Sequence, residues 1–353
     1  MSISMNVGRL AKSFSKIRIK KSYFIFKKMS PRFVQKILRK FKNALRGFVY
    51  DANIFSAMGY KYYGPIDGHN IKELIRYFEF AKKSPNSVVL HIKTTKGKGY
   101  CFSEKDSIGT WHGVKPFDLE TGESLIKNND DEINWGLGIC HILNELADKY
   151  ENFKVISPAM IIGSNLLEFQ ELHHDRLIEV GIAEEHAVVM AAGMARNNVV
   201  PFVSIYATFM QRAYDEISHD VCRSNNHVIF LVDRAGLVSG DGSTHQGIFD
   251  IAMLSHLPNM VITMPKDLNQ ARLLISFAYG YNGPIAIRYP KGVTKLPVIV
   301  DKEISLGKWD IELPISEVNI ITYGPEVDLY KERLMGKNIG LINAFFIKPI
   351  DEE

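Results

Sequence analysis

The chain has 353 residues, of which 46% are hydrophobic and 23% are charged, and its formal net charge at pH 7 is +4. This length is sufficient for two or more domains with cores of their own, and the composition is ordinary for a soluble globular protein. No uninterrupted apolar run approaches the roughly 18 to 20 residues of a membrane-spanning helix, which excludes that class. The three cysteines lack the paired spacing of a metal site. Such sparse use is typical of a reducing compartment, so we expect a cytoplasmic protein.

Residues 1–118 are expected to form a first domain that begins with a basic connecting stretch. Lys and Arg recur through residues 1–50, where Asp and Glu are absent. Beyond them the pattern predicts a helix over residues 71–82, a buried strand over residues 88–92 and a glycine-rich turn at residues 97–99. The polar, turn-rich residues 119–131 then indicate a linker.

Strands and helices alternate through residues 132–300, as in a mainly parallel sheet with helices on both faces. We therefore predict a multi-domain α/β fold, with a further α/β unit starting in residues 301–353. Ligands bind such sheets at the carboxyl ends of the strands, where Tyr206, Asp233 and Arg288 fall. The expected strands are residues 154–157, 202–206, 228–232, 261–264, 285–288 and 318–322, and the expected helices are residues 184–196, 210–223 and 268–279.

Three short blocks in the central domain carry the residues that indicate a function. They read GIAEEHAV at residues 181–188, YATFMQRAYD at 206–215 and DRAGLVSGDGSTHQG at 233–247. Glu184 follows an apolar stretch and begins a helix of small residues. A carboxylate there is hard to bury without a partner or a function, and its pKa should rise. Such a group suits a hydrogen bond to the aminopyrimidine ring of thiamine diphosphate. The alternative is an acid that complements the helix dipole.

Together these blocks resemble the 1-deoxy-D-xylulose-5-phosphate synthase family of transketolase-like thiamine enzymes. YKYYGPIDGHN at residues 60–70, HIKTTKGKGY at 91–100, EKDSIGTWHGVKPFD at 104–118 and GPIAIRYPKG at 283–292 also look like that family, in its order. The resemblance thus covers essentially the whole chain. It implies a thiamine diphosphate-binding fold and a transferase that condenses pyruvate with D-glyceraldehyde 3-phosphate. The products would be CO2 and 1-deoxy-D-xylulose 5-phosphate, a precursor for isoprenoid, thiamine and pyridoxal synthesis.

The resemblance also implies which residues act on the cofactor and in catalysis. Glu184 looks like the partner of the aminopyrimidine ring, and Phe209 looks like the ring that stacks on it, with core packing as the alternative for Phe209. Tyr100, at the end of KGKGY, looks like a further cofactor contact. His112 and His245 lie in glycine-bearing loops, and they are the general acid–base candidates because histidine titrates near neutrality.

A second set of residues is expected to bind the substrates. Arg234 and Arg288 come directly after strands, and the planar fork of arginine suits a phosphate dianion. The resemblance assigns both to the phosphate of glyceraldehyde 3-phosphate, and an ion pair at a strand end is the alternative for each. Further substrate-binding residues implied by the resemblance are Tyr206, Arg212 and Asp241.

Two positions near these residues leave structural questions open. Arg212 could pair with Asp215 along its helix instead of binding substrate. Glu185 stands where many relatives have Gln, which would add a charge beside Glu184. We expect Glu185 to point outward, because adjacent residues of a helix lie on different faces.

The resemblance further implies that the chain is a central fragment of the enzyme. In the family, MSIS follows a GDG…N motif that binds Mg²⁺, and the third domain continues beyond residue 353. We therefore expect the Mg²⁺ ligands in a missing N-terminal part and none in this chain. Gly240–Asp241–Gly242 follows a polar loop rather than a strand, and it matches the metal-free GDG of the family. Alone, such a fragment should bind thiamine diphosphate weakly and turn over little substrate unless a separate chain completes it. Family members are homodimers, and we expect the same here.

Other functions stay open from the sequence. One is another transketolase-like enzyme, such as a transketolase or the β subunit of a pyruvate dehydrogenase, although PIDGH, TWHG and DGSTHQG favour the synthase. Residues 1–50 could also be a transit peptide, or the arm of a non-catalytic protein that binds nucleic acid or anionic membrane. Because MSISMNVG looks like the interior of the family, we favour a solvated connector and expect neither nucleic acid nor membrane as a partner.

Overall fold

The computed structural model describes residues 53–126 and 129–353. Two compact units make up the chain, Met1–Gly113 and Val114–Glu353. The basic stretch expected within residues 1–50 lies outside the described residues. No helix in the described ranges combines the length and the apolar character needed to cross a membrane.

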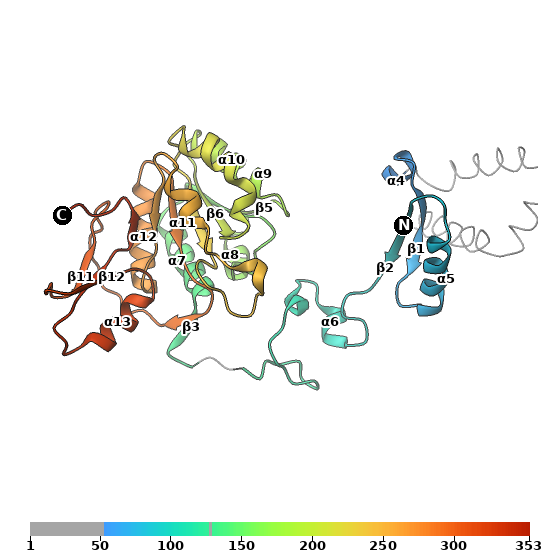
Figure 1. The fold of residues 1–353 in the computed structure, drawn as a ribbon, viewed down its shortest axis with the longest axis horizontal. Coiled ribbons are helices and arrows are strands. Elements are labelled where there is room, and N and C mark those ends of the chain that lie inside the picture. The colour runs from blue at the N-terminus through green and yellow to red at the C-terminus, as the bar shows by residue number, and fades with distance from the viewer. Residues whose placement is uncertain (1–52, 127–128) are drawn as a thin grey trace, which may run out of the picture. The chain divides into compact units, whose positions relative to one another are not determined.

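The first unit has a parallel pair of strands with one long helix. Asn70 begins that helix, because its side-chain oxygen accepts a hydrogen bond from the backbone N–H of Glu73 at 3.1 Å. Tyr63, Ile66 and Tyr77 form the small buried core. The second strand is half buried rather than buried as predicted, since the core of this unit is small. The elements are α4 (Ile54–Ala57), β1 (Lys61–Asp67), α5 (Ile71–Lys82), β2 (Val88–Lys93), α6 (Cys101–Lys105) and η1 (Thr110–His112) (Figure 1).

The second unit contains a seven-stranded sheet in the order β14-β8-β9-β7-β6-β4-β5. The strands from β8 to β5 run parallel, and β14 is antiparallel to β8. At the carboxyl ends of the central strands, Tyr206 aligns with Asp233 and Val232 aligns with Arg288. The strands are β4 (Phe153–Ser157), β5 (Leu177–Glu179), β6 (Val200–Tyr206), β7 (Ile229–Asp233), β8 (Val261–Thr263), β9 (Ile285–Arg288) and β14 (Phe346–Lys348).

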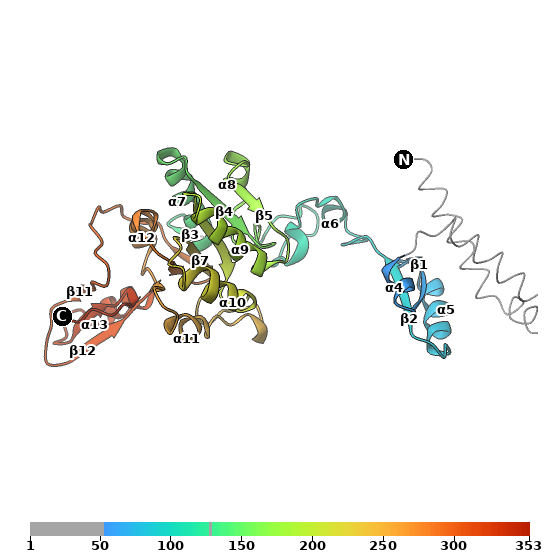
Figure 2. The same ribbon diagram turned by 90° about the horizontal axis from the view of Figure 1, so that it is seen from above.

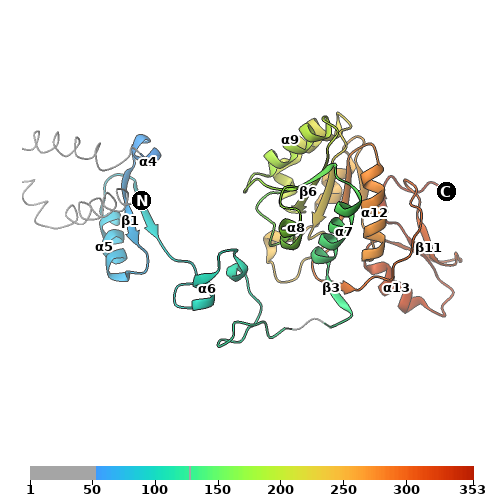
Figure 3. The same ribbon diagram turned by 180° about the vertical axis from the view of Figure 1, so that it is seen from behind.

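Helices cover both faces of this sheet, which confirms the predicted mainly parallel α/β fold. Along β6, Phe202 packs into one apolar core and Val203 into the other, because successive side chains of a strand point to opposite faces. On the first face lie α7 (Trp135–Lys149), α8 (Leu167–Leu172) and α12 (Leu268–Gly280), of which α7 and α12 stand in front of the sheet in Figure 3. On the second lie α9 (Glu184–Ala195), α10 (Tyr214–Glu216) and α11 (Asp250–Ser255), and Figure 2 shows α10 and α11 across the sheet from α7 and α8.

The helix predicted over residues 210–223 is divided into turns of different type. It consists of the 3-10 helix η2 (Met210–Ala213), the α-helical turn α10 and the π-helix η3 (Ile217–Cys222). Met210, Ala213 and Ile217 nevertheless reach the same core. An apolar pattern therefore predicts the buried face of this segment, whereas the change of turn type depends on the neighbours against which it packs.

The last residues form a smaller layer against the main sheet. Its strands are β11 (Asp310–Leu313), β12 (Asn319–Thr322) and β13 (Gly340–Asn343), in the order β11-β13-β12, with α13 (Glu326–Leu334). The strand expected near residues 318–322 is confirmed as β12. Glu312 joins this layer to the main domain, because its carboxylate is paired with Lys266 at 2.5 Å and with Lys331 at 2.7 Å.

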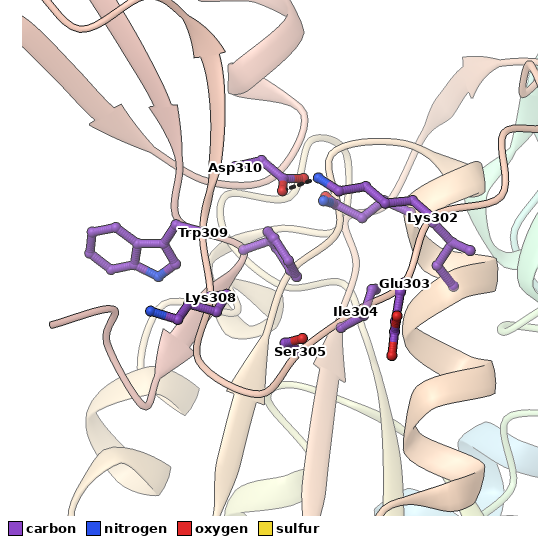
Figure 4. Close-up of a pocket in the computed structure, with 10 residues that line it drawn as sticks. Lys302, Glu303, Ile304, Ser305, Lys308, Trp309 and Asp310 are labelled. Atoms are coloured by element: carbon purple, nitrogen blue, oxygen red, sulfur yellow. Dashed lines mark hydrogen bonds and ion pairs between the residues drawn. The ribbon is translucent and has the colours of Figure 1, made fainter. Parts of the chain in front are cut away.

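A cavity of about 240 Å³ lies at this junction. Its lining comes from α12, Phe345 and the segment between Lys302 and Asp310. Figure 4 shows Lys302 turned toward Asp310, with which it forms an ion pair. Of the described residues that line the cavity, none is a predicted cofactor or substrate residue, so the predicted site lies elsewhere.

The ion pairs of Glu312 lead to a prediction about stability and pH. Burial raises the pKa of Glu312, but hydrogen bonds from Lys266 and Lys331 outweigh it and hold that pKa below its ordinary value of 4.5. Because the folded pKa is the lower one, the stabilisation is present above the ordinary pKa and is lost as pH falls through the folded value. We expect Glu312→Gln to lower the free energy of unfolding by about 1 to 3 kcal/mol at neutral pH. The difference between variant and wild type should shrink as the solution is acidified.

Urea unfolding at several pH values checks this, with Glu332→Gln as the control. Glu332 pairs with Lys295 at 3.7 Å, and their side chains are 70% and 79% exposed. Exposed pairs contribute little, so the control should lose less than about 0.5 kcal/mol. Equal losses in the two variants would contradict the anchoring role of Glu312.

Candidate active site

Glu184 is the first residue of α9, and its side chain is only 2% exposed. The loop before it is held by Glu179, whose Oε1 accepts hydrogen bonds from the backbone N–H of Gly181 at 2.8 Å and of Ala159 at 2.7 Å. The carboxylate of Glu184 forms an ion pair with the guanidinium of Arg212 on η2. A buried charge is costly unless it is paired. This ion pair therefore explains how the acid can be buried at the start of an apolar helix.

Two of the open sequence questions are answered here. Arg212 pairs with Glu184, 28 residues earlier in the chain, and not with its helical neighbour Asp215. Glu185 is exposed, as predicted from its place on a different face of the helix. The buried acid at this helix start is thus Glu184 alone.

Aromatic rings connect this ion pair to the rest of the cluster. The guanidinium carbon of Arg212 lies 4.8 Å from the centroid of the Phe209 ring. Phe209 stacks on Tyr206 at a centroid distance of 5.2 Å. The imidazole of His245 packs edge-on against Phe209 at 5.4 Å. Phe209 rests on the core with one side but stays partly exposed, so core packing does not account for its whole surface.

Arg234 continues the cluster from the end of β7. Its φ of 60° lies in the left-handed region, which is uncommon for a residue with a side chain. The guanidinium carbon lies 4.1 Å from the centroid of the Tyr206 ring, and the guanidinium forms an ion pair with Asp241. Lys291 pairs with the same carboxylate. Nε of Arg234 is buried without a hydrogen-bond partner among the described residues.

The glycine-rich loop of the third sequence block is fixed at its base. Gly236 and Gly247 exchange two backbone hydrogen bonds, of 2.7 and 2.9 Å. The amide of Gln246 spans the loop, bonding the backbone N–H of Val238 at 2.8 Å and its carbonyl at 2.9 Å. A Cβ at Gly247 would lie 2.2 Å from the carbonyl oxygen of Arg234. Glycine is therefore required where the end of this loop meets the end of β7.

Asp233 is a buried acid to which the sequence motifs assign no role. It ends β7 and is 4% exposed. Burial raises its pKa to about 6, although the Arg234 charge beside it acts in the opposite direction. Burial also raises the pKa of Tyr206 to about 12, so the phenol stays protonated. Its sequence signals are its position at the end of a strand and at the start of the third block.

Arg288 lies apart from this cluster as far as its contacts show. It ends β9, is 3% exposed, and donates hydrogen bonds of 2.6 and 3.1 Å to Asp250 and one of 3.2 Å to the sulfur of Met264. These contacts agree with the alternative given for Arg288 from the sequence, an ion pair at the end of a strand. A role for Arg288 at the substrate phosphate stays a prediction.

Tyr100 and His112 belong to the first unit. Asp106 organises the loop between them, because it accepts a hydrogen bond of 2.8 Å from the backbone N–H of Trp111, and such bonds lower its pKa to about 2. The Tyr100 ring packs edge-on against Trp111 at a centroid distance of 5.0 Å. Nδ1 of His112 lies 2.9 Å from Nζ of Lys96. One short segment, residues 100–112 with α6 and η1, therefore carries both the predicted cofactor contact and a predicted acid–base residue.

Most of the predicted site residues of the second unit thus form one contiguous cluster. Its members are Glu184, Tyr206, Phe209, Arg212, Arg234, Asp241 and His245. Across residues 53–126 and 129–353, no group of three or more His, Cys, Asp or Glu side chains is arranged to hold a metal ion.

Comparison with known proteins identifies the family. Residues 131–296 match the transketolase pyrimidine binding domain, and residues 1–94 match 1-deoxy-D-xylulose-5-phosphate synthase. Over its whole length the chain is 42% identical to the 1-deoxy-D-xylulose-5-phosphate synthase of Listeria innocua and 40% identical to that of Bacillus velezensis. The chain belongs to the 1-deoxy-D-xylulose-5-phosphate synthase family. It spans 58% of the length of each of these synthases.

Solved structures support the same fold for this synthase-family chain. A split-gene transketolase, described as an inactive β4 tetramer, matches with a TM-score of 0.55 and 25% identity, covering 62% of this chain and 73% of that one. The transketolase from Leishmania mexicana matches with a TM-score of 0.52 and 16% identity, covering 65% of this chain and 37% of that one. At 16% identity the second match shows the fold alone.

The buried pair of Arg288 and Asp250 leads to a second prediction. Removing one partner of a buried ion pair leaves an uncompensated charge, which typically costs about 3 to 5 kcal/mol. We expect Asp250→Asn to lower the free energy of unfolding by about 3 kcal/mol, measured by urea unfolding with tryptophan fluorescence. Asp215→Asn, at an exposed acid, is the matched control and should change it by less than about 0.5 kcal/mol. A loss as small as that of the control would show that Arg288 does not depend on Asp250.

Proposed function

We propose that this chain carries the pyrimidine side of a thiamine diphosphate site at which pyruvate is condensed with D-glyceraldehyde 3-phosphate. The products are 1-deoxy-D-xylulose 5-phosphate and CO2, so the protein is a transferase of the transketolase type. Family membership supports this reaction, because the relatives from Listeria, Macrococcus and Bacillus are named for this synthase.

The observation that carries the proposal is a buried carboxylate beside an aromatic face. The guanidinium of Arg212 donates to Glu184 and lies over Phe209 at 4.8 Å. It is a flat group with N–H donors at its edge. An aminopyrimidine ring is also flat and also presents N–H donors, so these residues fit the pyrimidine end of the cofactor. We infer that Arg212 moves aside when the cofactor binds.

When bound, thiamine diphosphate supplies the carbon centre that takes up the acetyl unit of pyruvate as CO2 leaves. The residues of this chain hold the pyrimidine ring in position and control the proton at its edge. Glu184 holds a proton against the pyrimidine ring, and its burial keeps water from competing for the carboxylate. Phe209 sets the plane of the ring, since its own plane is fixed by the stack on Tyr206.

His245 is the proposed acid for the aldehyde oxygen of the acceptor. Its imidazole packs on Phe209 at 5.4 Å, so it borders the face assigned to the pyrimidine ring. From there it can give a proton to the oxygen that gains charge as the new C–C bond forms. Arg234, reached through Tyr206, is the proposed contact of the phosphorylated end, and its ion-pair partner Asp241 is a further proposed substrate-binding residue. Arg288 could join them only by exchanging Asp250 for the phosphate.

Further parts of the proposal concern the first unit and the assembly. Tyr100 is the proposed cofactor contact and His112 the proposed second acid–base residue. Mg²⁺ is proposed to neutralise the diphosphate, with ligands outside the described residues or on a separate chain that carries an N-terminal domain. A homodimer in the cytoplasm is proposed, and the partly exposed apolar face of α9 supports the dimer. Val189 there is 47% exposed, and a Cβ at Gly193 would have no neighbour within 4 Å.

A second candidate is a subunit that is inactive by itself. The split-gene transketolase structure is described as an inactive β4 tetramer, and this chain covers more of that protein than of the listerial synthase, 73% against 58%. This candidate predicts that activity requires a second polypeptide. The main proposal and this candidate share the same pyrimidine site.

Glu184 provides the test of the proposed reaction. The test uses the complete enzyme, meaning this chain together with the N-terminal domain proposed above, with thiamine diphosphate and Mg²⁺. We expect Glu184→Gln to lower kcat for formation of 1-deoxy-D-xylulose 5-phosphate by roughly 100-fold or more, because the carboxylate no longer controls the proton at the pyrimidine ring. Glu185→Gln is the matched control, one residue away and exposed, and should retain wild-type activity. Mass spectrometry of the products measures both. Transfer of a two-carbon ketol unit from a ketose phosphate without pyruvate, or equal activity of the two variants, would overturn the proposal.

A further inference from the structure

Lys291 is a charged residue of the cluster to which the resemblance assigns no role. It lies between Arg288 at the end of β9 and β10 (Val293–Lys295), and its side chain is 36% exposed. Its segment is held on both sides. The carbonyl of Tyr289 accepts a hydrogen bond from Ala235 N–H, and the carbonyl of Gly292 accepts one from Trp135 N–H, each at 3.0 Å. The base of the Lys291 side chain is therefore fixed relative to the end of β7.

Two cations share one carboxylate at this place. The ammonium of Lys291 pairs with Oδ1 of Asp241, and the guanidinium of Arg234 pairs with Oδ2. Burial and the nearby Arg234 charge hold the pKa of Lys291 below its usual value. Two like charges kept this close are unfavourable until more negative charge is added. Asp241 is the one carboxylate paired with both, and the buried Asp233 is a further acid that acts on them. The buried Nε of Arg234 has no hydrogen-bond partner among the described residues.

Arg288, the other cation expected at the phosphate, already has a buried partner. Asp250 accepts hydrogen bonds from Nε and Nη2 along one edge of its guanidinium, the Met264 sulfur accepts one from Nη1, and the side chain is 3% exposed. Opening that buried pair to admit a phosphate would leave Asp250 as an uncompensated buried charge. Lys291 needs a smaller rearrangement, because its ammonium is 36% exposed and its partner Asp241 is 15% exposed, whereas Asp250 is fully buried.

We propose that Lys291, together with Arg234, binds the phosphate group of the acceptor aldehyde and so selects phosphorylated over unphosphorylated acceptors. In this structure Asp241 is the counter-ion of both cations, and a phosphate dianion takes its place between them. The lysine ammonium attracts a phosphate as a point charge, while the planar guanidinium of Arg234 donates hydrogen bonds in fixed directions. This inference rests on the proposed condensation, and it adds Lys291 as the residue that distinguishes acceptors by the charge of their phosphate.

The test compares two acceptors in the complete enzyme with pyruvate as donor. For Lys291→Met we expect the KM for D-glyceraldehyde 3-phosphate to rise roughly tenfold or more, the scale of a lost hydrogen bond between charged groups. The kcat/KM for unphosphorylated D-glyceraldehyde should stay as in the wild type. Lys291→Arg should recover most of the affinity. Lys295→Met, on β10 and 79% exposed, is the control and should leave both acceptors unaffected.

Three results would overturn the assignment. Equal losses for the two acceptors would mean that Lys291 supports the loop rather than the phosphate. A rise in the KM for pyruvate alone would place the residue at the donor carboxylate. An unchanged KM for the phosphorylated acceptor would remove Lys291 from the site.

A binding measurement separates this inference from the proposed reaction. Inorganic phosphate at millimolar concentration should raise the thermal midpoint of the wild type and of Lys295→Met, but not that of Lys291→Met. If the wild type transfers nothing to either acceptor, the proposed reaction fails while the phosphate titration still tests Lys291. Equal shifts in all three proteins would then overturn the inference.

Discussion

The parallel register of β6, β7 and β9 is the constraint on which the rest of the site depends. Parallel strands end at the same edge of a sheet, so Tyr206, Asp233 and Arg288 are placed on adjacent strand ends although the chain between them is long. Two apolar cores, one on each face, hold that register, because a shift by one residue would exchange the side chains of the two faces. Polar and aromatic residues that follow β6 and β7 then gather into one cluster, while Arg288 at the end of β9 pairs with Asp250.

At this edge of the sheet, burial decides which charged groups must pair. Glu184 takes Arg212 and Arg288 takes Asp250, because neither charge could remain buried alone. Where burial is less complete, at Lys291, Arg234 and Asp241, the pairing is unequal, with two cations on one carboxylate. The fully buried Arg288–Asp250 pair is suited to fixing geometry, whereas the two cations on Asp241 are suited to receiving an anion.

The sequence predicts the sheet and its helices well, because hydrophobic periodicity reports burial directly. It also predicts the exposed side of Glu185 and the burial of Glu184, which follow from position on a helix. It does not predict the partners of the charged residues. Arg212 and Glu184 are 28 residues apart in the sequence, and Arg288 and Asp250 are 38 apart. Contacts between residues so far apart depend on how the strands and loops pack and not on local spacing. The π-helical turn at η3 and the sharing of Asp241 by Lys291 were missed for the same reason, and the half-buried state of β2 because the small core of the first unit leaves it partly uncovered.

The central claim is that the carboxylate of Glu184 and the face of Phe209 receive the pyrimidine ring in the place that the Arg212 guanidinium holds in this structure. A crystal structure of the complete enzyme with thiamine diphosphate and Mg²⁺ tests it most directly. The account predicts that the aminopyrimidine lies within hydrogen-bond distance of Glu184 and against Phe209, and that Arg212 has left both. A bound cofactor with the Glu184–Arg212 ion pair still intact would contradict it.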